Sequence, residues 1–405
     1  MKDKLFTIAK YLHPSHISAV GAYLLKDEAI SGKLILVALV LALVAANTPL
    51  APWYDTLFHS DLTIGFDEWK LSLSLREWIS EGLMVFFFLV VGLELKRELV
   101  RGELRHKETA ILPFAAAIGG MIIPALIFIC FNFGKDTMDG WAIPTATDIA
   151  LAVGILALLG DRIPSSIRIF LLALAIVDDI IAVIVIAAFY SADLNIVALV
   201  SMVAVAGALY CLGRFKTLSM WVFILGGIIL WLLTLESGVH PSIAGAILGL
   251  IAPIASKKKP GRQVAERAEK AMIPFTTLII VPLFAFANTG IALNVAEFNI
   301  DTAVSLGGGI IAGLVIGKFI GIFGASWLMV RFGFAKLPDG AGWSHIAGIG
   351  FLAGIGFTVA IFVTDLAFNN PTYVMIAKLS IIIASVIAAL IGLLVLRRAG
   401  SGIWR

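Results

Sequence analysis

Two adjacent aspartates, Asp178 and Asp179, lie in the middle of the apolar run at 169–190, which is otherwise uncharged. A run of this length can cross a bilayer as a helix. Each charged aspartate near the centre of such a helix costs roughly 2.5–3.5 kcal/mol on insertion scales. Folding alone therefore gives no reason to keep two carboxyl groups at this depth, and their presence indicates ion chemistry.

The spacing of the two aspartates determines which ions they can bind together. Neighbours on a helix point about 100° apart, so both carboxyl groups can face one cavity. Two close carboxyl groups resist being ionised together, so one of them retains a proton that an isolated aspartate would release. When both are ionised, their oxygens suit a small hard cation such as Na+ or Li+. Protons and the cation then compete for the same oxygens, which predicts a cation/proton antiporter.

The composition shows what kind of elements must position this pair. The 405-residue chain is 60% hydrophobic and 14% charged, with a mean hydropathy of +1.01. Soluble domains are about 45–50% apolar and about 25% charged, so an all-α polytopic membrane protein is predicted. The net charge is +3, and the basic residues are spread among short loops, which argues against a nucleic-acid partner. Cys130 and Cys211 form no metal or disulfide motif, and no cofactor is predicted.

Hydropathy windows of about 19 residues predict twelve membrane-spanning helices. Their ranges are 33–50, 78–97, 110–133, 140–160, 167–190, 194–213, 219–236, 239–256, 272–293, 303–332, 344–368 and 373–397. They form one transporter domain at 33–397, preceded by a leader at 1–32 and followed by a tail at 398–405. The leader can lie on the membrane surface or lack structure, and the sequence leaves both interpretations open.

The distribution of lysine and arginine predicts the orientation. Twelve spans put both termini on the same side of the membrane. With the N-terminus inside, 25 Lys and Arg residues lie on the cytoplasmic side and three lie outside. This asymmetry follows the positive-inside rule, so both termini are expected to be cytoplasmic.

Two further charges, Asp148 and Lys318, lie near the middle of other predicted spans. Asp148 follows Pro144 and Thr147. A proline removes a backbone donor, and threonine hydroxyls can pair with a disturbed backbone, so the fourth helix is expected to be broken. The ends of broken helices carry partial charges, and we expect Asp148 and Lys318 to act as their counter-charges. Glycines spaced by four on the tenth span should allow close approach of another helix; they are Gly313, Gly317 and Gly321.

The eleventh span carries four glycines within nine residues, in the run AGIGFLAGIGFTVAIF at 347–362. Glycine weakens a helix, so this span too is expected to be broken. Close packing through small residues is the alternative for this run considered alone. Spans four and eleven are the middle helices of spans 3–5 and 10–12. Matching interruptions in two three-helix units are typical of inverted-repeat transporters.

The external segment at 61–75 alternates polar and apolar residues on both sides of Asp67-Glu68. This pattern is typical of a short β-hairpin, although an irregular loop with chance alternation stays open. A lone hairpin is marginally stable in water. We therefore expect it to pair with another element, for example the same hairpin of a second protomer.

Several motifs together resemble the bacterial NhaA-type sodium/proton antiporters, an established example of inverted-repeat architecture. They are FFFLVVGLELKREL at 86–99, GWAIPTATDIALAVGILALLG at 140–160, LALAIVDDIIAVIVIAAFY at 172–190, SGVHPSIAG at 237–245, VPLFAFANTGI at 281–291, IIAGLVIGKFIG at 310–321 and GIGFTVAIF at 354–362. The resemblance implies twelve helices with crossed broken helices four and eleven, and a homodimer joined through the hairpin. It also implies electrogenic exchange of cytoplasmic Na+ or Li+ for external protons, for sodium extrusion and pH homeostasis, in the bacterial inner membrane.

The resemblance also implies roles for individual residues. The ion-binding pair falls on Asp178 and Asp179, with Asp179 as the principal ligand of Na+ or Li+. Thr147 and Asp148 match the broken-helix site, and Lys318 matches a lysine that pairs with Asp178. The pH response is expected at four residues in or near the cytoplasmic helix ends, namely Glu94, Glu98, Glu269 and Lys270.

Four positions depart from the family pattern. Lys270 and Ile273 replace expected histidines, Phe319 replaces an expected proline, and Glu81 replaces an expected aspartate. These departures concern the pH at which the protein becomes active, and they leave the exchange chemistry intact.

Other functions fit the sequence less well. A sodium-coupled symporter of related fold would need a cavity lined for an organic solute, and no motif in the sequence indicates such a cavity. An intramembrane aspartyl protease would need aspartates from two helices, usually with a GxGD motif that does not occur here. A channel would tolerate acidic residues in its lining, but it would not need two adjacent acids and a lysine. A secondary transporter is therefore expected rather than an enzyme.

Overall fold

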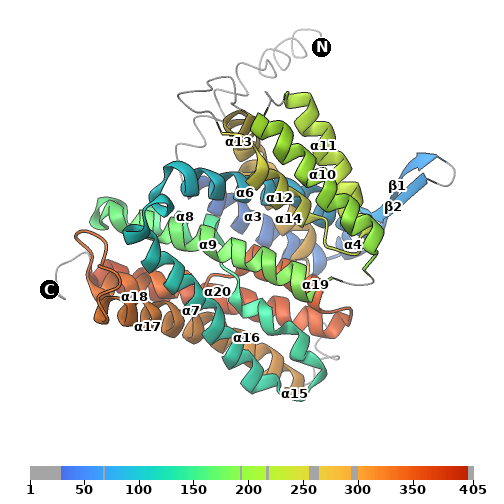
Figure 1. The fold of residues 1–405 in the computed structure, drawn as a ribbon. Helices are drawn as coiled ribbons and strands as arrows, with labels where there is room; N and C mark the ends of the chain where they lie inside the picture. Colours follow the sequence, from blue (N-terminus) through green and yellow to red (C-terminus); the bar gives the residue numbers. More distant parts are fainter. Residues whose placement is uncertain are drawn as a thin grey trace, which may run out of the picture.

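The computed structural model is a helical bundle (Figure 1) and describes residues 29–66, 69–191, 194–215, 219–254, 264–292 and 300–399. The predicted leader up to residue 28 and the predicted tail from residue 400 lie outside the described residues. The α-helices are α3 (Ala29–Ala46), α4 (Ala51–His59), α5 (Leu75–Glu77), α6 (Met84–Arg101), α7 (Lys107–Asn132), α8 (Ile149–Ala157), α9 (Ser165–Phe189), α10 (Ile196–Phe215), α11 (Met220–Glu236), α12 (Ser242–Ile251), α13 (Val264–Phe275), α14 (Val281–Asn288), α15 (Ile300–Thr302), α16 (Gly308–Ala312), α17 (Lys318–Arg331), α18 (Trp343–Leu352), α19 (Phe357–Ala367) and α20 (Pro371–Ala399).

Several helices contain or adjoin other helical forms. The 3-10 segments are η2 (Glu103–Arg105), η3 (Asp136–Thr145) and η4 (Gly160–Arg162), and the π-helical segments are η1 (Trp78–Leu83), η5 (Thr276–Ile280), η7 (Ala303–Gly307) and η8 (Gly313–Gly317). Single π-turns inside α-helices are frequent at functional sites. The segment η8 directly precedes Lys318.

The apolar helices confirm a multi-pass membrane protein. Within the described ranges, eight helices are long and apolar enough to cross a membrane, or up to ten if each of two bent pairs forms one span. The shorter apolar helices α11 and α12 occupy the predicted spans at 219–236 and 239–256. The total of twelve spans and the inverted repeat stay predictions.

The first predicted span ends earlier than expected. Helix α3 ends at Ala46, and after a turn of 110° the chain continues as α4, a helix that the sequence analysis did not predict. Asn47 and Pro49 follow the last turn of α3, and these residue types favour a helix end. The Tyr54 hydroxyl donates to the Phe286 carbonyl at 2.5 Å and so joins α4 to α14.

The predicted hairpin is confirmed. Strand β1 (Asp61–Phe66) pairs antiparallel with β2 (Trp69–Ser74), in a register that runs from Asp61 opposite Ser74 to Phe66 opposite Trp69. It projects from the helical bundle at one side (Figure 1). The Ser74 side chain, at the end of β2, caps α5.

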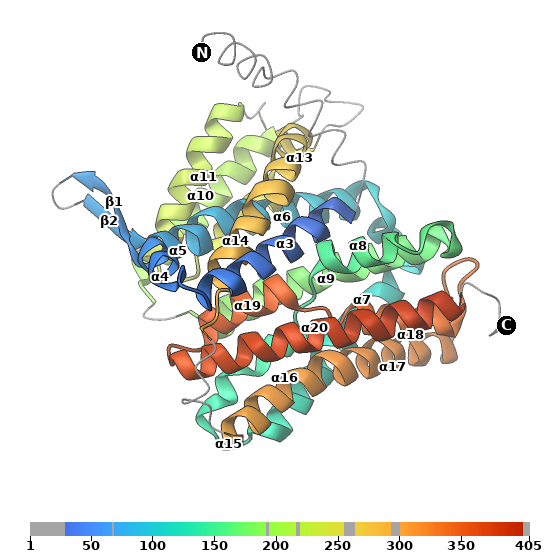
Figure 2. The ribbon, with the colours of Figure 1, turned by 180° about the vertical axis from the view of Figure 1, so that it is seen from behind.

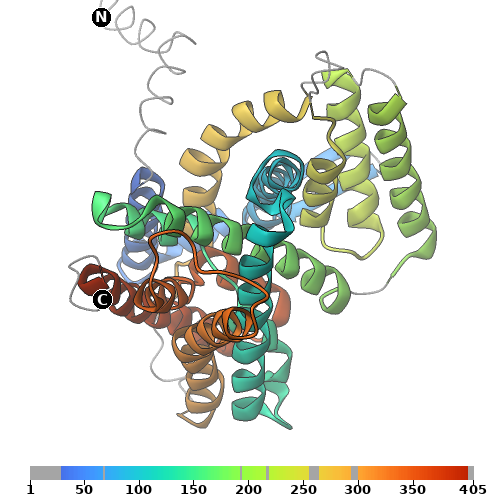
Figure 3. The same cartoon turned by 60° about the vertical axis from the view of Figure 1, so that its left-hand side comes forward.

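The helices gather in two groups around the predicted site. Helices α10, α11 and α12 pack together on one side, and α7, α17, α18 and α20 lie on the other, with α6 and α9 between them (Figure 3). In the second group α17, α18 and α20 lie side by side (Figure 2). Helix α9, which carries the aspartate pair, therefore lies in the interior and contacts α6, α7 and α8.

The glycine face predicted on the tenth span packs against α7 and η3. A Cβ added at Gly317 would lie 2.8 Å from Pro124 Cα, and one at Gly313 would lie 2.6 Å from Pro144 Cβ. At Gly321 an added Cβ would collide with the carbonyl of Gly119. Such short distances, to backbone atoms or to a rigid proline ring, leave no room for a side chain, so the expectation of close approach is confirmed.

We predict that Gly321→Ala destabilises the protein by about 1–3 kcal/mol, because an extra methyl group overpacks the contact between α7 and α17. Gly324→Ala on the same helix is the matched control, since a Cβ there meets no atom within 4 Å. Relief of the helix-weakening effect of glycine should make this control neutral or more stable. Thermal unfolding in one detergent compares the two variants, and equal melting temperatures would show that the α7–α17 contact is loose.

Candidate functional site

Two interruptions cross at the centre of the protein and complete each other's backbone. The link at 146–148 joins η3 to α8, and the link at 353–356 joins α18 to α19, with a bend of 45°. The Asp148 amide donates to the Ile355 carbonyl at 2.6 Å, and the Thr147 hydroxyl donates to the Ala353 carbonyl at 2.8 Å. Broken helices leave unpaired backbone groups at their ends, and each interruption supplies partners to the other.

The Asp148 carboxylate compensates the positive ends of two short helices. Its Oδ1 accepts from the Leu151 amide at 3.0 Å and so caps α8. Its Oδ2 accepts from the Thr358 amide at 3.1 Å and from the Thr358 hydroxyl at 2.5 Å, in the first turn of α19. A carboxylate at a helix N-terminus is favoured by the helix dipole and by the free amides. Asp148 therefore lies where the sequence analysis expected a counter-charge.

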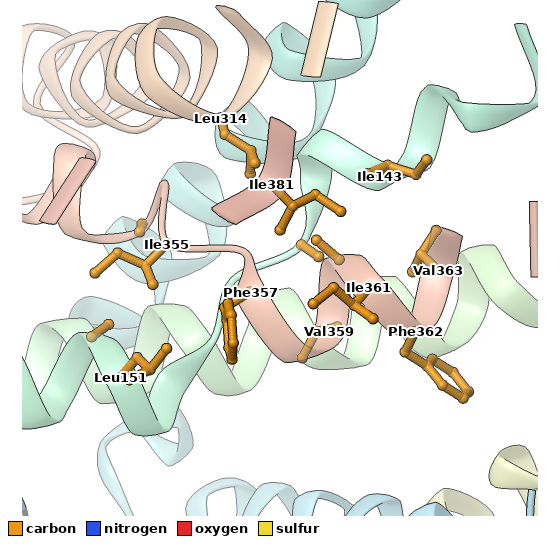
Figure 4. Packing of buried hydrophobic residues seen from close by; sticks show 14 of the residues in the cluster. Ile143, Leu151, Leu314, Ile355, Phe357, Val359, Ile361, Phe362, Val363 and Ile381 are labelled. Atoms are coloured by element: carbon orange, nitrogen blue, oxygen red, sulfur yellow. The ribbon is translucent and has the colours of Figure 1, made fainter. Parts of the chain in front are cut away.

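The surroundings of the crossing are apolar. Figure 4 shows Ile355 and Phe357 beside the link between α18 and α19, with Leu151 of α8 below them. These side chains are at most 4% exposed. Polar groups in such a place must satisfy one another, because water is not there to do so.

Lys318 lies beside Asp178. The Lys318 Nζ donates to Asp178 Oδ2 at 2.7 Å, and both side chains are almost fully buried, at 1% and 3% exposure. The sequence analysis expected this ammonium at a helix end, and its hydrogen bond goes instead to the aspartate that the family resemblance named. Buried ion pairs of this kind are costly to break, because the remaining charge has no partner.

Asp179 is the unpaired member of the site. Its side chain is 2% exposed, and its Oδ2 is buried without a hydrogen-bond partner. Asp178, Asp148 and Glu94 are close enough to act on Asp179 through their negative charges, and Lys318 is the positive group that acts on it. A buried carboxylate oxygen without a partner carries a large desolvation penalty. A proton or a small cation at this oxygen would remove that penalty.

Comparison with known proteins shows the family of this chain. The family model described as Na+/H+ antiporter 1 matches residues 22–396. The chain belongs to this Na+/H+ antiporter family. It is 43% identical over 370 residues to the Na(+)/H(+) antiporter NhaA 1 of Clostridium beijerinckii, which covers 91% of this chain and 92% of the relative. It is 45% identical over 371 residues to the Na(+)/H(+) antiporter NhaA of Aliivibrio fischeri, which covers 91% and 94% of the two chains.

A solved structure is similar in fold. The sodium proton antiporter MjNhaP1 from Methanocaldococcus jannaschii aligns over 98% of both chains, with a TM-score of 0.51 and 15% sequence identity. At this identity the likeness concerns the fold alone. The family resemblance inferred from the sequence motifs is confirmed by the family model and by the closer relatives.

The residues expected to govern the pH response in this antiporter family lie mostly in one contact between α6 and α13. Arg97 forms ion pairs with Glu269 and with Glu98, the latter at 3.7 Å. Glu94 is one turn from Glu98 and interacts electrostatically with this group. Lys270 is exposed and makes no ion pair with a described side chain. The structure thus brings three of the four residues together and leaves Lys270 outside the group.

Sequence reasoning missed three polar contacts between helices. Thr358 bonds Asp148 through both its amide and its hydroxyl, and the only signal was a threonine just after the glycine run. Lys96 donates to the Leu250 carbonyl at 2.7 Å and so compensates the C-terminal end of α12. Lys378 of α20 is buried and forms an ion pair at 2.6 Å with the half-buried Asp365 of α19.

We predict that Lys318→Ala lowers the free energy of unfolding by about 3–5 kcal/mol, because it leaves Asp178 buried and unpaired. Lys135→Ala is the control, since Lys135 is exposed near the end of α7. Melting temperatures in the same detergent should fall clearly for the first variant and hardly for the second. Equal shifts would mean that Lys318 is well solvated.

Proposed function

We propose that this protein exchanges Na+ for H+ across the membrane, with Asp178 and Asp179 as the common site of both ions. The observation that carries the proposal is the buried Asp179 oxygen without a partner, next to an aspartate held by an ammonium. Membership of the Na+/H+ antiporter family supports the identity of the two ions. Li+ is expected to replace Na+, because oxygen donors of this kind suit small hard cations.

The exchange follows from competition for the carboxylate oxygens. In the sodium-free state the Lys318 ammonium compensates Asp178, and a proton compensates Asp179. A sodium ion bound between the two carboxylates competes with both, so the Asp179 proton and one proton of the Lys318 ammonium are released. Two protons for one Na+ make the exchange electrogenic, with external protons entering and cytoplasmic Na+ leaving. Because an empty charged pair is costly in an apolar surrounding, the site changes sides only when it is loaded.

The proposed arrangement in the membrane is that of the sequence analysis. Twelve spans would contain the inverted units 3–5 and 10–12, with the crossed links at 146–148 and 353–356 in their middle helices. Both termini would be cytoplasmic in the bacterial inner membrane. The excess of lysine and arginine on one side supports this orientation.

We predict that Asp178→Asn and Asp179→Asn each abolish proton movement driven by Na+ or Li+. An amide oxygen carries no charge and cannot take up a proton, so the competition is lost. Purified protein in pH-loaded vesicles with an internal pH dye measures the exchange. Asp136→Asn is the control, since Asp136 is exposed at the start of η3 and should leave exchange unchanged. Exchange like the wild type in either site variant would remove that residue from the mechanism.

We predict that the apparent dissociation constant for Na+ rises, so that Na+ binds more weakly, as the pH falls. Below the pH at which the pair titrates, each competing proton raises this constant up to about tenfold per pH unit, and above that pH it levels off. Glu269→Gln and Lys270→Ala should shift the curve only modestly, because neither residue contacts the pair. Sodium titrations at several values between about pH 6 and 9 measure this constant in the wild type and in the two variants. A constant independent of pH, with only the maximal rate changing, would point to a separate cytoplasmic switch.

We also propose that the hairpin joins two copies of the chain. Among the described residues, β1 and β2 form a sheet with no third strand, and its edges can pair with another hairpin. Replacing residues 62–73 with a short glycine-serine linker keeps Ser74, the cap of α5. Native mass spectrometry should then show monomers while exchange survives. A dimer that persists would place the interface in the helices.

A further inference from the structure

A hollow of about 430 Å³ lies away from the transport site, where α8 and α20 end. Leu158, Gly160, Arg162, Leu393 and Arg397 contribute to its lining. Asp148 caps the opposite end of the nine-residue helix α8, and a helix of that length spans about 14 Å. The hollow is therefore separate from the carboxylates that the exchange uses.

The hollow presents two arginines that have no acidic partner among the described side chains. Arg162 and Arg397 are exposed, and neither forms an ion pair with a described side chain. A third arginine, Arg168, bonds the backbone instead. Its Nη2 donates to the carbonyl of Gly160, a residue that lines the hollow, at 2.7 Å. Guanidinium groups recognise phosphate oxygens through paired hydrogen bonds. The hollow thus suits a phosphate group.

An apolar stripe on α20 leads to the same place. Ile383, Val386, Leu390 and Leu394 are 49–56% exposed. Their spacing of three and four residues puts them on one face of the helix, and Arg397 continues that face three residues later. The stripe runs from Ile383 to Leu394, a rise of about 16 Å along the helix, which matches one leaflet of a hydrocarbon core of about 30 Å.

We propose that this hollow binds an anionic phospholipid. Its phosphate lies between Arg162 and Arg397, and one acyl chain follows the stripe from Leu394 to Ile383. Leu158 is 65% exposed at the hollow and offers a second apolar contact. A free phosphate would use the arginines but not the stripe, so the continuity of the two features favours a lipid. With the proposed orientation, the lipid belongs to the cytoplasmic leaflet.

Native mass spectrometry of the full-length protein, stripped of lipid in detergent, tests the proposal. Added phosphatidylglycerol should bind more tightly than phosphatidylcholine of the same chains. Each arginine should contribute about fivefold in affinity, the equivalent of about 1 kcal/mol for a basic residue near an anionic surface. Arg162→Gln with Arg397→Gln should therefore weaken phosphatidylglycerol binding about 25-fold. Arg331→Gln, at another exposed helix end, is the control and should leave it unchanged.

Two further arms separate a lipid from a free phosphate. Leu390→Asn should weaken phosphatidylglycerol binding, because the acyl chain contacts the stripe. It should not change how far inorganic phosphate displaces the lipid, because phosphate does not contact the stripe. Inorganic phosphate at the same concentration should not displace the lipid. Equal binding of the two lipids, or unchanged binding in the double arginine variant, would overturn the site. Displacement by inorganic phosphate would overturn the choice of a lipid. None of these outcomes depends on sodium/proton exchange.

Discussion

The need to satisfy backbone groups inside an apolar protein governs the centre of this molecule. Two helices stop and restart there, and each stop leaves amides and carbonyls that water cannot reach. The two links solve the problem for each other, through Asp148 with Ile355 and Thr147 with Ala353. The crossing is therefore the arrangement in which two interrupted helices can be buried together, and the charged groups are arranged around it.

Charge balance explains why one carboxylate remains available. Asp148 is balanced by the first turns of α8 and α19, and Asp178 is balanced by Lys318. Asp179 has no ion pair among the described side chains, and its Oδ2 has no hydrogen bond. Asp365 is also an intramembrane acid, but the Lys378 ammonium lies 2.6 Å from it. Asp179 is thus the acid of this site that neither an ion pair nor a helix end compensates, which is why we propose it as the group that exchanges a proton for a cation.

Local sequence signals predicted the elements that depend on local chemistry. Pro144 and the glycines of 347–362 predicted the two helix interruptions, and the alternation of polar and apolar residues at 61–75 predicted the hairpin. These features act within a few residues, so they can be read from the sequence. Helix α4 was missed because a nine-residue apolar segment after Pro49 lies below the length that a hydropathy window detects. The Thr358 contact and the Arg97 ion pairs could not be predicted. The contacts of Thr358 with Asp148 and of Arg97 with Glu269 join segments more than 170 residues apart, and hydropathy does not show which faces of two helices meet.

The crossing also limits how the site can move. Asp148 joins α8 to α19 through three hydrogen bonds of one carboxylate, and Thr147 ties the same link to the end of α18. A hydrogen bond to a charged group contributes about 1.5–3 kcal/mol, and a buried charge left without it is costly. Sliding α8 past α19 would break several such bonds at once, whereas moving both helices together would break none of them. Any movement at the site is therefore easiest when the crossing moves as one unit against the helices around it, among them α9, which carries Asp179.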